Sequence, residues 1–250
     1  MAHVVRVLRL RFVNQQITPA ALPNSIQGNG QEIHTMGFGV KVWVAGLVAA
    51  ASASAVMAAG SADAGKTKAA VCMGCHGVDG NSPADMWPKI AGQLPQYISK
   101  QLHDFKAGRR ANEQMSPMAQ PLTDQDVEDL AAFFSTQVAS KAEGKKELLN
   151  AGETIYLKGK GRPDVVPACK GCHGPTGAGK NDWAATMKRP PTTLAPAIGS
   201  QHPAYIANQL KAYKTKARTN DEAHVMRDIA ARLTDADIEA VAQFVATLSR

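Results

Sequence analysis

The clearest hydrophobic pattern in the chain is an apolar stripe at helical spacing, which occurs twice at an offset of 111 residues. Each stripe follows a Thr and two Asp residues, which favour a helix start because Thr caps the first turn and acids complement the helix dipole. The stripes consist of Val127, Leu130, Ala131 and Phe134 in the first copy and of Ile238, Val241, Ala242 and Val245 in the second. Because such spacing puts apolar residues on one helix face, we predict helices after Thr123 and Thr234.

Two further helices are predicted in each copy. A middle helix is predicted from Tyr97 to Phe105, and the same pattern recurs from Tyr205 to Tyr213 in the second copy. An earlier helix is expected from Gly65 to His76 in the first copy, and from Leu148 to Lys158 in the second. No alternating, strand-like pattern flanks the cysteine motifs discussed below, so the predicted fold class is all-α.

The chain reads as a tandem duplication, because the segments between these helices also match in register. Pro88 corresponds to Pro196 at an offset of 108, and Met115 corresponds to Met226 at an offset of 111. The second copy is longer by insertions near residues 159–166, 180–191 and 222, which we expect in surface loops. We therefore predict one domain over residues 59–140, a hydrophilic linker over 141–146 and a second domain over 147–250.

The N-terminal region has the layout of a secretory signal over residues 36–58. Lys41 is followed by the apolar run Val42–Val48, and Val56-Met-Ala58 fits a small-x-small cleavage site. A membrane helix needs about 20 apolar residues, so we favour cleavage over a retained anchor. Residues 1–35 do not fit a signal and are interpreted as a disordered upstream extension of the reading frame. The expected location is the periplasm.

Composition changes this picture only slightly. Aromatic residues make up 5% of the chain, and at roughly 85–105 residues per domain a bound cofactor would help to complete each core. The formal net charge is +7 but is spread along the sequence. No Lys/Arg block resembles a nucleic-acid-binding arm, so no nucleic-acid partner is expected.

The motif Cys72-Met-Gly-Cys75-His76 occurs again as Cys169-Lys-Gly-Cys172-His173, and together they use all four cysteines of the chain. C-x-x-C-H is the attachment signature of c-type haem. The two thiols form thioethers to the porphyrin vinyl groups, and the adjacent His supplies the proximal iron ligand. We predict two covalently bound haem c groups. A redox dithiol or a zinc site is the less favoured alternative, since neither explains both histidines.

The repeat also indicates the second axial ligand. Met115 and Met226 each lie eight residues before the capping Thr of the last helix, whereas Met118 aligns with Ile229. We therefore assign Met115 and Met226 as distal ligands, with core packing as their alternative role. His103, His202 and His224 are rivals, but none has a histidine at the matching position. Pro88 and Pro196 are candidates to accept a hydrogen bond from each proximal imidazole.

The chain resembles the cytochrome c4 family of dihaem class I cytochromes c over nearly all of residues 59–250. The resemblance is carried by the segments 69–83, 88–93, 151–156, 167–174, 218–220 and 226–231. It implies two class I cytochrome c domains packed with pseudo-twofold symmetry, and His76/Met115 and His173/Met226 match the family's axial ligands. It also implies a periplasmic electron carrier rather than an enzyme, often loosely membrane-associated, that can feed a haem–copper terminal oxidase.

Two other functions stay open at this point. The chain could instead be the dihaem cytochrome subunit of a flavin-containing sulfide dehydrogenase or of another periplasmic dehydrogenase. A dihaem peroxidase is the third hypothesis, and it would need one open or switchable iron. In each case the expected partners are redox proteins, either periplasmic or membrane-bound.

Overall fold

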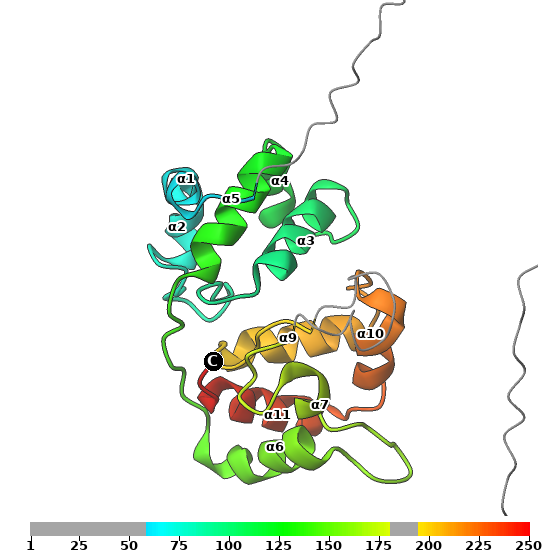
Figure 1. Cartoon of the computed structure of the whole chain (residues 1–250). Coiled ribbons are helices and arrows are strands. Elements are labelled where there is room, and N and C mark those ends of the chain that lie inside the picture. The colour runs from blue at the N-terminus through cyan, green and yellow to red at the C-terminus, as the bar shows by residue number, and fades with distance from the viewer. Residues whose placement is uncertain (1–58, 181–194) are drawn as a thin grey trace, which may run out of the picture. The chain divides into compact units, whose positions relative to one another are not determined.

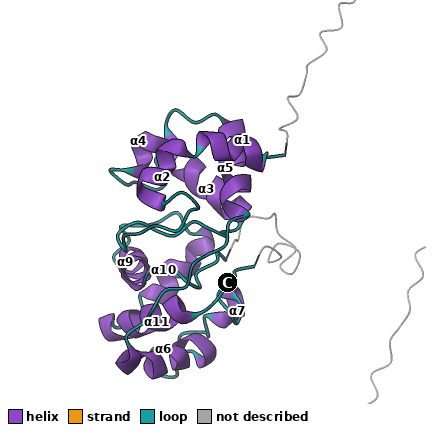
Figure 2. Ribbon diagram, turned by 90° about the vertical axis from the view of Figure 1, so that its left-hand side faces the viewer, coloured by secondary structure: helices purple, strands orange, loops and turns teal. Residues whose placement is uncertain are grey.

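The computed structural model describes residues 59–180 and 195–250 (Figure 1). The predicted upstream extension and signal peptide lie outside these ranges. The described residues form helices and loops, and they contain only isolated bridges, Lys160 with Val166 and Lys180 with Ala195, in place of strands (Figure 2). The predicted all-α class is confirmed. Within the described ranges, none of the helices combines the length and the apolar character needed to cross a membrane.

The first lobe contains α1 Ala62–Lys68, α2 Ala70–His76, α3 Pro95–Lys106, α4 Met115–Ala119 and α5 Asp124–Ser135. The single helix predicted from Gly65 to His76 is therefore two helices. Ala69 ends α1 with φ −68° and ψ −9°, and its N–H still donates to the Gly65 carbonyl. The backbone stays locally helical at this residue, so the sequence pattern gave no sign of the break.

The second lobe contains α6 Lys146–Lys158, α7 Lys170–His173, α9 Pro203–Lys214, the 3-10 turn η1 Glu222–His224, α10 Val225–Ala230 and α11 Asp235–Thr247. α6 begins at Lys146, the last residue of the predicted linker. The last helix of each lobe starts as predicted, with Thr123 and Thr234 in reciprocal capping boxes with Asp126 and Asp237. The short helices α4, α7 and α10 were not predicted.

Each lobe has its own core, in which its first helix crosses its last one. Phe133 and Phe134 of α5 pack in the first core, and Tyr156 of α6 is fully buried in the second. The crossings are close because a glycine lies at each. A Cβ on Gly65 would lie 1.9 Å from the Asp129 carbonyl oxygen, and one on Gly152 would lie 2.1 Å from that of Ala240.

The two lobes meet along an interface, called the seam below, in which residues 88–93 of the first lobe face residues 196–201 of the second, and its hydrogen bonds are reciprocal. Gln201 accepts from Lys89 N and donates to Lys89 O, both at 2.9 Å. Gln93 accepts from Ala197 N at 2.9 Å and donates to Ala197 O at 2.8 Å. Gln93 and Lys89 correspond to Gln201 and Ala197 in the repeat, so each lobe makes to the other the contacts that it receives. This is the pseudo-twofold packing that the sequence resemblance implied.

Candidate functional site: two haem-binding lobes

The two C-x-x-C-H motifs lie on equivalent helical turns. Residues 72–76 form the end of α2, and residues 169–173 form the cap and body of α7. Cysteines three residues apart on a helical turn share one face, as attachment to a single porphyrin requires. Directly after each His, Gly77 at φ +82° and Gly174 at φ +79° turn the chain. A side chain at these positive φ values would be strained, so glycine is the residue that fits.

Both motif histidines are buried and oriented alike. His76 and His173 are each 7% exposed. The Nδ1 atom of His76 donates to the Pro88 carbonyl at 2.9 Å, and that of His173 donates to the Pro196 carbonyl at 2.9 Å. A carbonyl can only accept, so the proton lies on Nδ1 and Nε2 keeps its lone pair for a metal. The predicted hydrogen bonds from the two imidazoles to the carbonyls of Pro88 and Pro196 are confirmed.

Burial keeps these imidazoles neutral. It lowers the pKa of His76 and of His173 below the usual range, although the bond to each proline carbonyl acts in the opposite direction. A neutral imidazole is the form that ligates iron, so the lowered pKa favours ligation at ordinary pH.

The four cysteines are half-buried and form no disulfide. Burial raises the pKa of Cys72, and it raises the pKa of Cys169 to about 11. A reactive dithiol requires a lowered thiol pKa, so these surroundings disfavour that alternative. They suit sulfurs that become uncharged thioethers on haem attachment.

The candidate distal ligands occupy equivalent short helices. Met115 is the first residue of α4, Met226 is the second of α10, and both are half-buried. Met118 is 42% exposed. The rival histidines in the middle segments have other partners, because His103 Nδ1 bonds the Ser99 carbonyl at 2.9 Å and His202 Nε2 bonds the Ser82 carbonyl at 3.0 Å.

The seam reaches the proximal side of both sites. Gln201 holds the backbone of Lys89, which is the residue next to the carbonyl that orients His76. Gln93 holds Ala197 in the same way, next to the carbonyl that orients His173. Each lobe therefore fixes the loop that positions the proximal imidazole of the other lobe.

Two arginines also join the lobes, a role that the sequence analysis did not predict. Arg110 donates to Tyr205 OH at 3.1 Å and to Gln209 Oε1 at 2.9 Å. Arg218 makes the equivalent bonds in the opposite direction, donating to Tyr97 OH at 2.9 Å and to Gln101 Oε1 at 3.1 Å. Each guanidinium also stacks on an aromatic ring of its own lobe, at 4.7 Å from the Phe105 centroid and 4.6 Å from that of Tyr213. The offset of 108 residues that relates the prolines also relates these arginines, and could have revealed them.

The residues present therefore fit two c-type haem groups, one in each lobe. In both, a thiol pair, a buried imidazole with a free Nε2 and a half-buried thioether lie on equivalent elements. This donor set defines a c-type cytochrome with two haem domains.

Comparison with known proteins agrees. The cytochrome c family model matches residues 62–137 and again residues 149–249. Cytochrome c4 of Thiocapsa roseopersicina is 46% identical over 76% of this chain and 94% of its own length. The crystal structure of reduced cytochrome c4 from Pseudomonas stutzeri is similar with a TM-score of 0.69 and 43% identity, and the match covers 76% of this chain and 100% of that one. A thiosulfate dehydrogenase electron acceptor of Thiomonas intermedia is 37% identical over 72% of this chain and 79% of its length.

The chain belongs to the cytochrome c4 family. It is accordingly a dihaem cytochrome with covalently bound haem c, and its two Cys-x-x-Cys motifs supply the attachment chemistry.

Proposed function

We propose that this chain shuttles single electrons between periplasmic redox proteins, with a terminal oxidase as the final acceptor. Cys72 and Cys75 would anchor the first haem between His76 and Met115. Cys169 and Cys172 would anchor the second between His173 and Met226. Haem supplies reversible one-electron chemistry, and the protein supplies burial, orientation and axial ligands.

The observation that carries this proposal is the matched placement of the candidate ligands in both lobes. Each lobe has a buried His fixed through Nδ1 by a proline carbonyl, and a half-buried Met on an equivalent short helix, so each haem would have both axial ligands available. An iron with both axial positions occupied has no open position for oxygen or peroxide. Such a site transfers electrons without binding small substrates, which favours a carrier over a peroxidase.

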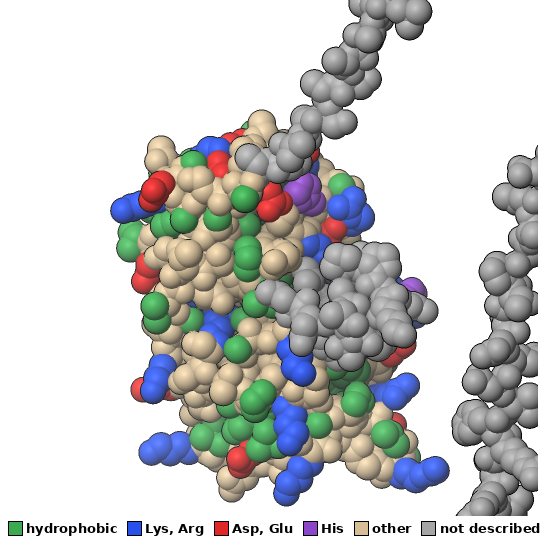
Figure 3. Space-filling view, in the orientation of Figure 1, with side chains coloured by type: hydrophobic (Ala, Val, Ile, Leu, Met, Phe, Trp, Pro, Cys, Tyr) green, Lys and Arg blue, Asp and Glu red, His purple; other side chains and the backbone are tan. Residues whose placement is uncertain are grey.

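The charge distribution is compatible with docking by transient contact. On the face that Figure 3 shows, Lys and Arg side chains are scattered among Asp and Glu rather than gathered in one patch. Partners would thus be redox proteins that meet the haem edges, and export through the predicted signal peptide would place the chain among them. Peripheral membrane association would bring it close to a membrane-bound oxidase.

Carbon monoxide tests directly whether both axial positions are occupied. We expect the ferrous protein to show no carbon monoxide adduct at neutral pH, while a redox titration resolves two one-electron steps. A carbon monoxide adduct at either haem in the folded protein would mean an open iron. That result would replace the carrier function with a catalytic one.

A dehydrogenase-linked role is the second candidate, because one relative is named as a thiosulfate dehydrogenase electron acceptor. The chain would then receive electrons from a sulfur-oxidising enzyme, or form its cytochrome subunit. Purification from the native host separates the cases. Stoichiometric recovery with a flavoprotein or a thiosulfate dehydrogenase supports the subunit role, whereas recovery as a single chain supports the free carrier.

A further inference from the structure

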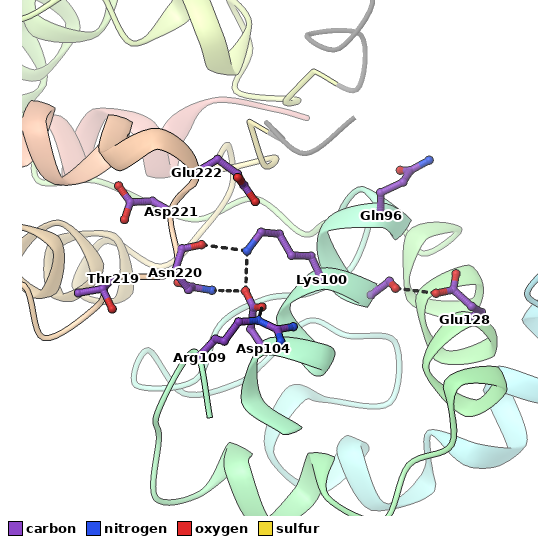
Figure 4. Close-up of a pocket in the computed structure, with 10 residues that line it drawn as sticks. Gln96, Lys100, Asp104, Arg109, Glu128, Thr219, Asn220, Asp221 and Glu222 are labelled. Carbon is purple, nitrogen blue, oxygen red and sulfur yellow. Dashed lines mark hydrogen bonds and ion pairs between the residues drawn. The ribbon is translucent and has the colours of Figure 1, made fainter. Parts of the chain in front are cut away.

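The seam contains one feature that breaks its twofold relationship, the carboxylate of Asp104 on α3. The position is equivalent to Ala212 on α9, because the Arg110 N–H donates to the Asp104 carbonyl at 3.0 Å and the Arg218 N–H donates to the Ala212 carbonyl at 3.0 Å. Only the first lobe therefore has a charge here. Asp104 is 3% exposed although it lies beside a cavity of ≈ 550 Å³ (Figure 4).

Both oxygens of the Asp104 carboxylate accept hydrogen bonds, and the donors together come from both lobes (Figure 4). Oδ1 accepts from Arg109 Nε at 2.7 Å. Oδ2 accepts from Lys100 Nζ at 2.5 Å and, across the seam, from Asn220 Nδ2 at 2.7 Å. Lys100 also donates to the Asn220 carbonyl at 2.9 Å, and Asn220 Nδ2 donates to Gln101 Oε1 at 3.0 Å, so three bonds hold Asn220 to the first lobe.

Two of these partners, Arg109 and Asn220, lie in the chain segments that precede the two proposed distal ligands. Arg109 lies six residues before Met115, and Asn220 lies six residues before Met226. In the first lobe the residue aligned with Asn220 is Asn112, whose side chain accepts from Met115 N, the first N–H of α4, at 2.8 Å. The Asn220 side chain instead crosses the seam, and in the second lobe it is Asp221 that accepts from a first-turn N–H of α10, that of Arg227, at 3.0 Å. In the second lobe the side chain of Asn220 is therefore available to donate a hydrogen bond to Asp104.

The charge on Asp104 makes these bonds strong. Burial alone would raise the pKa of Asp104, but the bonds from Lys100, Asn220 and Arg109 outweigh it, so the pKa lies below the usual range. Hydrogen bonds to a charged group stabilise more than neutral ones do, and a buried carboxylate left without partners is costly. Moving either loop therefore requires breaking bonds to a group that also holds the other loop.

We propose that Asp104 is a positioning residue that fixes the distal-ligand loops of both haems together, residues 107–115 and 218–226. This rests on the proposed ligation by Met115 and Met226. Because coupling between two sites is reciprocal, a disturbance of either loop is then felt at the other haem.

Asp104→Asn tests the proposal, with hydrogen exchange of the oxidised holoprotein as the principal measurement. Loss of a hydrogen bond to a charged group should speed exchange roughly tenfold or more in both loops. The charge-transfer band of methionine-ligated ferric haem should weaken or broaden for both haems. Faster exchange in residues 107–115 alone would reduce Asp104 to a local ion pair, and unchanged exchange in both loops would also overturn the proposal.

Asp129→Asn is the matched control, because it neutralises a carboxylate of the same lobe that is also 3% exposed. Asp129 accepts from Ser61 N at 2.8 Å and from Lys68 Nζ at 2.6 Å, and among residues 59–180 and 195–250 its hydrogen bonds all lie within the first lobe. Its effect should be confined to the first lobe, near α1. Faster exchange in residues 218–226 of this control would show a general loosening of the protein and remove the special role of Asp104.

Asn220→Ala provides a second variant that keeps the buried charge. It should speed exchange in residues 107–115 as well as in its own loop, and an effect restricted to the second lobe would contradict the proposal. A failure of the proposed electron-carrier function would be seen in a different measurement, the charge-transfer band of the unaltered protein. If the unaltered protein lacks the methionine band at either haem, the ligand assignment fails, while the exchange measurements still decide whether Asp104 joins the two loops.

Discussion

Replacing Met115 with alanine should remove about half of the methionine–Fe(III) charge-transfer band and lower one of the two reduction potentials. A thioether is a soft ligand that favours ferrous iron, so its loss stabilises the oxidised form. Axial ligands set haem potentials over a range of ~0.8 V, and the shift should greatly exceed any change at the second haem. Optical redox titration of the purified holoprotein measures both quantities at once.

Met118→Ala is the control for this prediction. Met118 lies one turn further along α4 and is 42% exposed, so its removal should leave the band and both potentials unchanged. A Met115→Ala protein with an intact band would exclude Met115 as a ligand. Loss of the band in Met118→Ala would move the assignment to that residue.

The second large effect concerns stability. Gly152→Val should destabilise the second lobe by ~3 kcal/mol, the upper end of the usual range for overpacking, because the new side chain meets backbone that cannot rotate away. A Cβ at Gly152 would lie 2.1 Å from the Ala240 carbonyl oxygen and 2.7 Å from Phe244 Cβ. The crossing of α6 and α11 would have to open, and Tyr156, which packs on Phe244 with ring centroids 5.7 Å apart, would lose its place in the core.

Ala151→Val separates overpacking from helix propensity. Residue 151 precedes the glycine on α6 and is exposed, so a β-branched side chain there should cost less than ~1 kcal/mol. Chemical denaturation followed by far-UV circular dichroism compares the two variants. Equal stability of Gly152→Val and Ala151→Val would show that the helices are not in close contact at this crossing.

The sequence predicted those features that recur at corresponding places in the two copies. The helices that begin after Thr123 and Thr234 could be located because capping residues and an apolar stripe coincide there. The proline carbonyls that orient His76 and His173 were anticipated because both prolines follow their haem motifs at matching places. In each case local chemistry and the duplication pointed to the same residues.

Contacts between the lobes were harder to foresee. Asp104 has no charged counterpart in the second copy, so comparison of the repeats gave it no weight. Its role depends on Asn220, which is 116 residues away in the chain and reaches it only when the lobes are packed. The break at Ala69 was missed for a different reason, since alanine is itself a good helix former and gives no sign that α1 ends there.

The exchange of glutamine contacts between the lobes has a consequence for how such a chain can arise. Gln93 and Gln201 bind equivalent backbone positions of the opposite lobe, so both halves present the same patch to each other. Two identical chains related by a twofold axis form interfaces of this isologous kind. The tandem chain thus has, in covalent form, the geometry expected of a homodimer of single-haem proteins, and because its halves are not identical, one of them carries a buried charge, Asp104, that the other lacks.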